Sequence, residues 1–473
     1  MKRRKWVRLG AYALVLAALL AFYLLYNKDA EDYTEETTEE QELTLIEKGG
    51  EELEMIRLEN SNRRLTFMLS RAEAEGDESE WRLEEMPGLT LDSGAVSGLA
   101  GSFSALKAEN KLEAAEELSA YGLSPGMVTG TGFYSDGSQA RLTLGSQTPD
   151  NKYYYALLND SADIYLISRT VGERFFYAPD DVMDTALPDV TSEELRFLHV
   201  SAGGRRDIEV SKIENEFIMA SPFNGRPVWA NTLDENIISA AQGLTLSGLV
   251  KYDAPSLEEY GLDQPVMEII LEGEENLLHL LIGSEIDESL SYCMEAQGSH
   301  VYSIENSLLK PFYEIEPFSI IDTFVNLMYK DNVDAIYINS PGQSYEIQLN
   351  RELVPVEKAE GNEGQSEEEE LFDEVLSPEV NGIAVEERVF TSFYTKLISL
   401  SFDSEIEARP VSEYPEPEVT IEYVTIDGGS AISRFYEYNQ DFYAVQTGGG
   451  DPAFAVSKRS VELMLKHEMF TAL

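Results

Sequence analysis

Serine and lysine occur twice at the spacing of a known nucleophilic pair, as Ser104 with Lys107 and as Ser307 with Lys310. In penicillin-recognising enzymes this spacing places a serine nucleophile beside a lysine, together with Ser-Asp-Asn and Lys-Thr-Gly motifs. Neither pair is accompanied by these motifs here, and Ser307 stands where we expect a helix to begin. We therefore interpret both pairs as structural.

The other groups that could bind a metal or act as nucleophiles are His199, His279, His300, His467 and Cys293. No two histidines have the i, i+4 spacing of a helical metal site, and no H-E-x-x-H motif occurs. A single cysteine permits no intramolecular disulfide and no Cys-rich zinc site. We expect it to be a small buried apolar residue. The sequence thus predicts no catalytic residue, no metal site and no cofactor.

Three further motifs could bind ligands. The acidic run Glu367–Glu370 lacks the ligand order and central glycine of an EF-hand, and whether it binds divalent cations stays open. Gly448–Gly450 lies between two expected strands, so it predicts a hairpin turn rather than a phosphate loop. Tyr153–Tyr155 fits either an exposed ligand face or cross-strand packing, and packing is the simpler interpretation.

The composition indicates a globular, acidic chain of several domains. The 473 residues include 35 basic and 87 acidic ones, for a net charge of −52, with 43% hydrophobic and 10% aromatic residues. A surface this negative repels nucleic acid, so we expect no nucleic-acid partner. The length favours about three domains.

A basic flank, Lys2–Lys5, precedes an apolar run from Leu9 to Tyr26. A helix of this length spans about 27 Å, close to the thickness of a bilayer's hydrocarbon core. A cleaved signal peptide would have a shorter apolar core followed by small residues, which Phe22–Tyr26 does not provide. We expect an uncleaved single-pass anchor in the cell membrane, with a cytoplasmic N-terminus and an extracytoplasmic bulk. The expected anchor residues are Trp6, Leu9, Leu14, Leu19, Phe22 and Tyr26.

Beyond the anchor, one corner motif recurs. Leu118–Pro125 contains Tyr-Gly-Leu and a proline, and Leu257–Pro265 repeats the pattern. Because glycine follows tyrosine in both, we expect a positive φ or a close backbone approach there. Tyr414 marks a third, decayed copy. The corner residues, expected to be structural, are Tyr121, Gly122, Leu123, Pro125, Tyr260, Gly261, Leu262 and Pro265.

Each copy of the corner lies in a unit of short strand-like runs around one amphipathic helix, such as the helix carrying Val96, Leu99 and Phe103. Short turns such as Asp136-Gly137 favour antiparallel pairing. The predicted fold class is α+β, with an N-terminal transmembrane helix followed by three tandem antiparallel-sheet-plus-helix repeat units. The expected segments are an anchor with its cytoplasmic flank (1–27), an acidic stalk (28–48), and units at 49–188, 189–322 and 323–473, the last with an acidic disordered insertion near 357–374.

This order resembles a bacterial, membrane-anchored family of unknown function numbered 4340. The residues that carry the resemblance are Trp81, the two corners, Asp136-Gly137, Gly145, Gly283 and Tyr153–Ala156. The third unit matches only in outline, since Gly and Leu are lost after Tyr414. The resemblance implies a protein found beside gliding-motility-type ABC export systems, and it supplies no catalytic residues.

Anchor, repeats and resemblance together favour a non-catalytic, membrane-anchored extracytoplasmic binding or assembly module. The expected partners are the lipid bilayer, through the N-terminal helix, and a membrane protein complex of the ABC-transporter type. An envelope hydrolase and a passive surface spacer stay open as alternatives.

Overall fold

A computed structural model describes residues 43–70, 80–112, 117–123, 128–159, 161–355 and 372–471. None of the helices in these ranges has the length and apolar character needed to cross a membrane. The expected anchor lies in residues 1–42, outside the described ranges, as do nearly all of the expected stalk before Leu43, Pro125 and the acidic run Glu367–Glu370. The described chain is mostly β-sheet with few helices.

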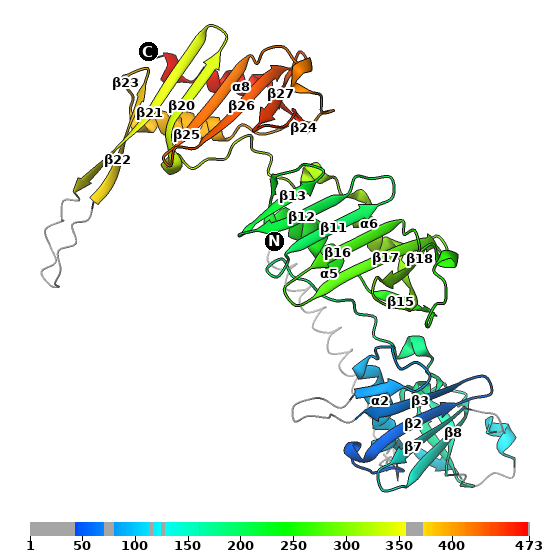
Figure 1. The fold of residues 1–473 in the computed structure, drawn as a ribbon. Coiled ribbons are helices and arrows are strands. Elements are labelled where there is room, and N and C mark those ends of the chain that lie inside the picture. Colours follow the sequence, from blue (N-terminus) through cyan, green and yellow to red (C-terminus); the bar gives the residue numbers. More distant parts are fainter. Residues whose placement is uncertain are drawn as a thin grey trace, which may run out of the picture.

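Large antiparallel sheets follow one another along the described chain (Figure 1). The first has eight strands, and the second and third have nine each. In spatial order, the first sheet contains β4 (Glu80–Leu83), β3 (Arg64–Ser70), β2 (Leu53–Glu59), β7 (Val128–Tyr134), β8 (Gln139–Gln147), β9 (Tyr153–Leu158), β10 (Ile164–Ser168) and β6 (Asn110–Leu112).

The second and third sheets have the same order, with one more strand beside the counterpart of β4. The second contains β14 (Arg226–Val228), β13 (Glu216–Ser221), β12 (Ile208–Ile213), β11 (Phe197–Ala202), β16 (Met267–Glu272), β17 (Leu277–Glu285), β18 (Leu290–Glu295), β19 (Val301–Glu305) and β15 (Leu246–Lys251). The third contains β23 (Ile383–Ala384), β22 (Phe372–Val380), β21 (Gln343–Pro355), β20 (Val333–Ser340), β25 (Val419–Thr425), β26 (Ser430–Glu437), β27 (Phe442–Thr447), β28 (Phe454–Ser457) and β24 (Ser404–Glu405). A separate two-stranded sheet pairs β1 (Leu43–Thr44) with β5 (Lys107–Ala108).

Each large sheet joins two meanders through a central antiparallel ladder, namely β2–β7, β11–β16 or β20–β25. Between the meanders, the chain leaves one edge, forms a helical segment and returns as the short strand at the other edge. Period-two alternation explains the strands, as in β11, where Leu198, Val200 and Ala202 are buried and the residues between them are not.

The crossing helices bury one face against their sheets. The first is α2 (Ser93–Ser104), which Asp92 caps by accepting hydrogen bonds from the backbone N–H groups of Gly94 and Ala95. Its buried face includes Val96, Leu99 and Phe103, the face expected from the sequence. The others are α4 (Ala230–Leu233) with α5 (Ser239–Gln242), and α7 (Glu387–Ile398). The other α-helices of the described ranges are α3 (Arg169–Glu173), α6 (Asn306–Glu314), α8 (Lys458–Leu465) and α9 (Glu468–Thr471).

The second crossing segment is not one regular helix, because a π-helical turn, Asp234–Ile238, separates α4 from α5. The apolar spacing in the sequence also predicts Leu106, Leu244 and Val385 in the three helices, but all three lie outside them. Leu106 and Leu244 are buried just after their helices end. Val385 precedes α7 in extended chain, where its N–H donates to the Pro378 carbonyl. These side chains share the core with the helix without being helical, so spacing alone misplaced them.

The two corners interlock with the sheets. Gly122 and Gly261 have φ of 71° and 68°, the positive values expected there. A Cβ on Gly261 would collide with the Ser284 side chain and lie 3.0 Å from the Ser284 backbone nitrogen. A Cβ on Gly283 would collide with the Tyr260 carbonyl oxygen. Both sides of this contact therefore need glycine.

Candidate functional site

The four histidines lie in separate surroundings. The His279 Nε2 is 2.7 Å from the Glu268 Oε1 on the neighbouring strand, and His300 stacks on Tyr252 with ring centroids 4.3 Å apart. His199 lies on β11 and is half-buried. His467 is buried between α8 and α9, and burial lowers its pKa. Within the described ranges, no group of three or more His, Cys, Asp or Glu side chains is placed to hold a metal ion.

The residues weighed above as candidate nucleophiles, which the sequence analysis interpreted as structural, are engaged in local contacts. Cys293 on β18 is fully buried, and burial raises the pKa of its thiol to about 12, so the thiol is neutral at physiological pH. The Ser307 hydroxyl donates to the Glu305 carboxylate at 3.1 Å, whereas Lys310 pairs with Glu314. The Ser104 hydroxyl donates back to the Ala100 carbonyl within α2. These contacts are those of structural residues.

The two connections between successive sheets have the same hydrogen-bonded geometry. We call them the joints, and their linkers contain Asp184-Thr185 and Asp322-Thr323. At the first joint the Asp184 N–H donates to the Thr90 carbonyl of the first sheet's segment, and the Leu246 N–H in β15 donates to the Thr185 carbonyl, both at 2.9 Å. Adjacent linker residues are therefore bonded to consecutive sheets. The Asp184 carboxylate also accepts from the Ala186 N–H at 2.9 Å, which fixes the linker's turn.

The second joint repeats this arrangement. The Asp322 N–H donates to the Pro227 carbonyl at 2.8 Å, and the Phe402 N–H donates to the Thr323 carbonyl at 2.7 Å. The Asp322 carboxylate accepts from the Phe324 N–H at 2.8 Å. Each linker thus uses an Asp-Thr pair, with aspartate tied to the preceding sheet and threonine to the following one.

Side chains reinforce the first joint. The Gly88 N–H in the first sheet's edge loop donates to the Tyr252 hydroxyl at 3.1 Å. Tyr252 lies on His300, so the loop reaches a stacked pair of rings from the second sheet. Asp180 accepts from the Leu249 N–H in β15 at 2.8 Å.

The second joint adds charge and aromatic contacts. Arg206, in the turn between β11 and β12, forms two hydrogen bonds of 2.5 and 2.7 Å to the Glu405 carboxylate in β24. The Arg226 guanidinium lies 4.4 Å from the Phe402 ring centroid and 5.4 Å from that of Phe454. Burial lowers the pKa of Arg226, and Asp322 opposes this shift. Bidentate arginine–carboxylate hydrogen bonds and cation–π contacts fix the relative orientation of the groups they join, in addition to the attraction that they contribute.

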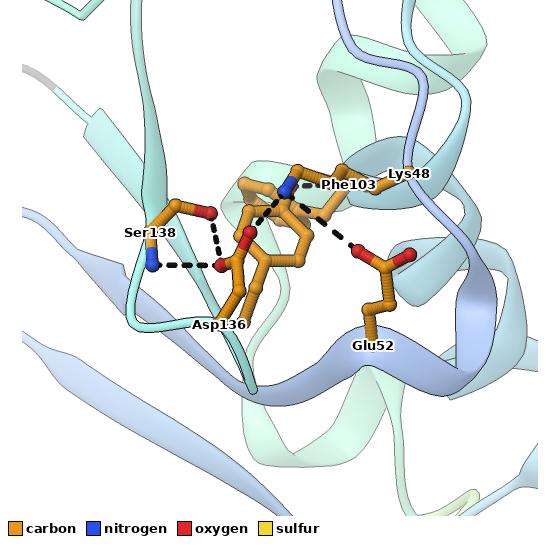
Figure 2. Close-up of polar contacts among 6 residues, drawn as sticks. Lys48, Glu52, Phe103, Asp136 and Ser138 are labelled. Atoms are coloured by element: carbon orange, nitrogen blue, oxygen red, sulfur yellow. Dashed lines mark hydrogen bonds and ion pairs between the residues drawn. The ribbon is translucent and has the colours of Figure 1, made fainter.

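A third polar cluster fixes the point where the chain enters the first sheet. Figure 2 shows Lys48 between the carboxylates of Asp136 and Glu52, with nitrogen–oxygen distances of 2.6 and 3.7 Å. Asp136 also accepts from the backbone N–H and the hydroxyl of Ser138. The hydrogen bond from Lys48, followed by those from Ser138, holds the pKa of Asp136 well below its usual range. Lys48 thus ties the N-terminal segment to the β7–β8 turn.

The first sheet differs from the others at its β4 edge. There the structure describes no strand outside β4, whereas β14 covers β13 and β23 covers β22. A cavity of about 570 Å³ lies at this edge. Its lining residues are Glu80, Trp81, Arg82, Pro87, Gly88, Leu89, Thr90, Leu91, Ser93, Val96 and Ser97. A smaller cavity of about 370 Å³ lies in the third sheet beside α8 and α9.

These features define a class of protein, a chain of large antiparallel sheets connected by hydrogen-bonded joints. The family model described as "Domain of unknown function (DUF4340)" matches residues 81–223 and 230–404, about two thirds of the chain. The protein belongs to this family. The comparison with curated proteins found no match, and neither did the comparison with solved structures.

The sequence analysis missed the joints, although a signal for them was present. Each linker has an Asp-Thr dipeptide between two apolar residues, at Asp184-Thr185 and at Asp322-Thr323. Both dipeptides follow the short helical segments that come after β10 and β19. The β4 edge could not have been found in this way, because the sequence identifies Trp81 only as a residue that carries the family resemblance.

Proposed function

We propose that the protein is a non-catalytic, membrane-anchored extracytoplasmic assembly module built from three tandem repeat units, and that it serves as an accessory component of an ABC-type transport system. The observation that carries the proposal is the repeated Asp-Thr joint. Successive sheets joined in the same way present their surfaces at fixed relative positions, and repeat arrays spread their binding surfaces across such units.

Other features support this proposal. The candidate nucleophiles in the described ranges are buried or hydrogen-bonded locally, and the Arg206–Glu405 pair connects the second sheet to the third. The basic flank and apolar run near the N-terminus suit an anchor. The Lys48 cluster lies just after the segment that would connect this anchor to the first sheet. The transporter as partner comes from the family resemblance.

The test is recovery of the full-length protein with its partners from solubilised membranes. We expect subunits of an ABC-type transporter to be recovered with the parent chain. Asp322→Ala, which removes the acceptor that fixes the second linker, should reduce this recovery several-fold. Asp427→Ala is the matched control, because Asp427 makes the same kind of contact, to the Gly429 N–H, in a hairpin away from the joints.

A second measurement checks the joint itself. Spin labels at Asn62 and Gln343, both exposed, report the distance between the first and third sheets. The parent and Asp427→Ala should give a narrow distance distribution, and Asp322→Ala a broader one. A parent that recovers no membrane partner would favour the passive spacer. Undiminished recovery with a broadened distribution would show that joint geometry does not matter for assembly.

A further inference from the structure

Among the described residues, no strand pairs with the outer side of β4. The Glu84 N–H donates to the Thr66 carbonyl, and β4 pairs with β3 in the register Phe67–Leu83 to Ser70–Glu80. The backbone N–H and C=O groups of successive residues point to opposite sides of an antiparallel strand. The backbone groups of Glu80 and Arg82 therefore hydrogen-bond to β3. The N–H and C=O of Trp81 therefore point away from β3, toward the cavity side.

In the second sheet this position is filled. Val228 of β14 lies opposite Phe217 of β13, the counterpart of Trp81, and Val228 is buried. In the first sheet the corresponding segment, Leu89–Leu91, lines the far side of the cavity, and Leu91 bridges to Met183 in the linker. The segment has kept its contact with the linker but is not paired with β4. We call the space between β4 and Leu89–Leu91 the slot, and it is the cavity of about 570 Å³ described above.

We propose that this slot receives an extended segment of a partner protein, which adds to the first sheet as its ninth strand. Strand addition of this kind obtains affinity from main-chain hydrogen bonds and specificity from pockets for alternate side chains. The proposal deepens the proposed function, on which it rests, by assigning the surface through which a partner is held.

The residues around the slot specify the chemistry of the segment. Trp81 and the buried Leu83 lie on the core-facing side of β4, where Leu89 and Val96 also line the cavity, so the residue opposite Trp81 should be apolar, as Val228 is. Glu80 and Arg82 are exposed on the other side. Read from its N-terminus, an antiparallel segment therefore needs an acidic residue opposite Arg82, an apolar residue opposite Trp81 and a basic residue opposite Glu80.

The probes are two synthetic peptides of equal composition, Thr-Glu-Val-Lys-Val and Thr-Lys-Val-Glu-Val, each carrying a fluorophore. Their binding to the purified full-length protein is measured by fluorescence anisotropy at about 0.15 M salt, where remote charges are screened beyond about 8 Å. We expect the first peptide to bind about tenfold more tightly, a difference of about 1.4 kcal/mol.

The deciding variant is the double swap Glu80→Arg with Arg82→Glu, which should reverse the preference between the two peptides. The control is the swap Glu59→Arg with Arg64→Glu, an ion pair of the same sheet on strands already paired, and it should leave the preference unchanged. Because the swapped residues are exposed, or half-buried in the case of Glu59, folding should be retained, and circular dichroism checks this.

Three results would overturn the proposal. These are no saturable binding of either peptide up to millimolar concentration, equal binding of both, or a preference that the Glu80/Arg82 swap leaves unchanged. Glu80-Trp81-Arg82 itself has the acid–apolar–base pattern, so concentration-dependent dimerisation lost on Arg82→Glu would instead assign the slot to a second copy. The peptide test uses purified protein, so its failure is distinguishable from failure to recover a membrane complex.

Discussion

Replacing Gly261 with alanine should destabilise the second sheet through two separable effects. The first is conformational, because φ is 68° at this position and the left-handed region costs an L-residue about 1–2 kcal/mol. The second is steric, since the new methyl group would collide with the Ser284 side chain and approach the Ser284 backbone nitrogen to 3.0 Å. Overpacking of this kind costs about 1–3 kcal/mol. The expected total is about 2–5 kcal/mol.

Gly204→Ala separates the two effects. Gly204 lies in the β11–β12 turn of the same sheet with φ of 79°, and no atom lies within 4 Å of the position its Cβ would take. This variant should lose only the conformational part, about 1–2 kcal/mol. The assay is urea unfolding of the full-length protein, following the transition that changes the fluorescence of Trp229, which lies between β14 of the second sheet and α4. A shifted midpoint with an unchanged slope reports a change in stability.

The comparison can refute the reasoning. Equal midpoints for Gly261→Ala and Gly204→Ala would show that Ser284 yields without cost, so that the corner needs glycine only for its backbone conformation. A midpoint for Gly261→Ala equal to that of the parent would remove the argument from backbone conformation as well.

Two further predictions concern titratable groups. Cys293 should resist alkylation in the native protein at pH 8, because the thiol is buried in β18 and its pKa of about 12 keeps it neutral. Urea-unfolded protein is the positive control, and rapid labelling without denaturant would contradict the prediction. Asp136 has a lowered pKa, so the stability it contributes is fully present above about pH 3.9 and is lost as pH falls through its folded pKa. Asp136→Asn should therefore flatten the acid limb of the pH–stability curve, measured by urea midpoints between pH 7 and 2. An unchanged acid limb would show that the exposed Lys48–Asp136 pair contributes nothing measurable to stability.

Strands and glycine corners were predictable because their causes are local. Alternation of apolar and polar residues predicts strand-like runs such as the one that forms β11, and a glycine after tyrosine signalled the positive φ of Gly122 and Gly261. Short edge strands such as β15 were missed, since a run of six residues interrupted by Gly248 is too short to show a periodic pattern. The Arg226 contacts were beyond sequence reasoning because Phe402 and Phe454 come from the third sheet, far along the chain.

The candidate surfaces were less predictable than the fold. Their distinguishing property is relational, since β4 is exceptional only beside β13 and β22, whose outer sides are covered. Neither Glu80 nor Arg82 carries a motif that would reveal an open edge. The Asp-Thr linkers show the opposite case, in which a repeated dipeptide marks a joint but looks unremarkable until both copies are seen bonded to two sheets.

The position of the joints inside the family matches has a practical consequence for dissecting the protein. The first match begins in β4 and ends just after β13, so it includes Asp184-Thr185 but excludes β2 and β3. A fragment cut at these limits would leave β7 without the strand that covers it and β4 without any neighbour. It would also carry β11 without β16. Such a fragment should aggregate through its unpaired strand edges. Cuts placed in the linkers would instead release whole sheets. The length of sequence that the family model matches and the length that can fold alone therefore differ in this protein.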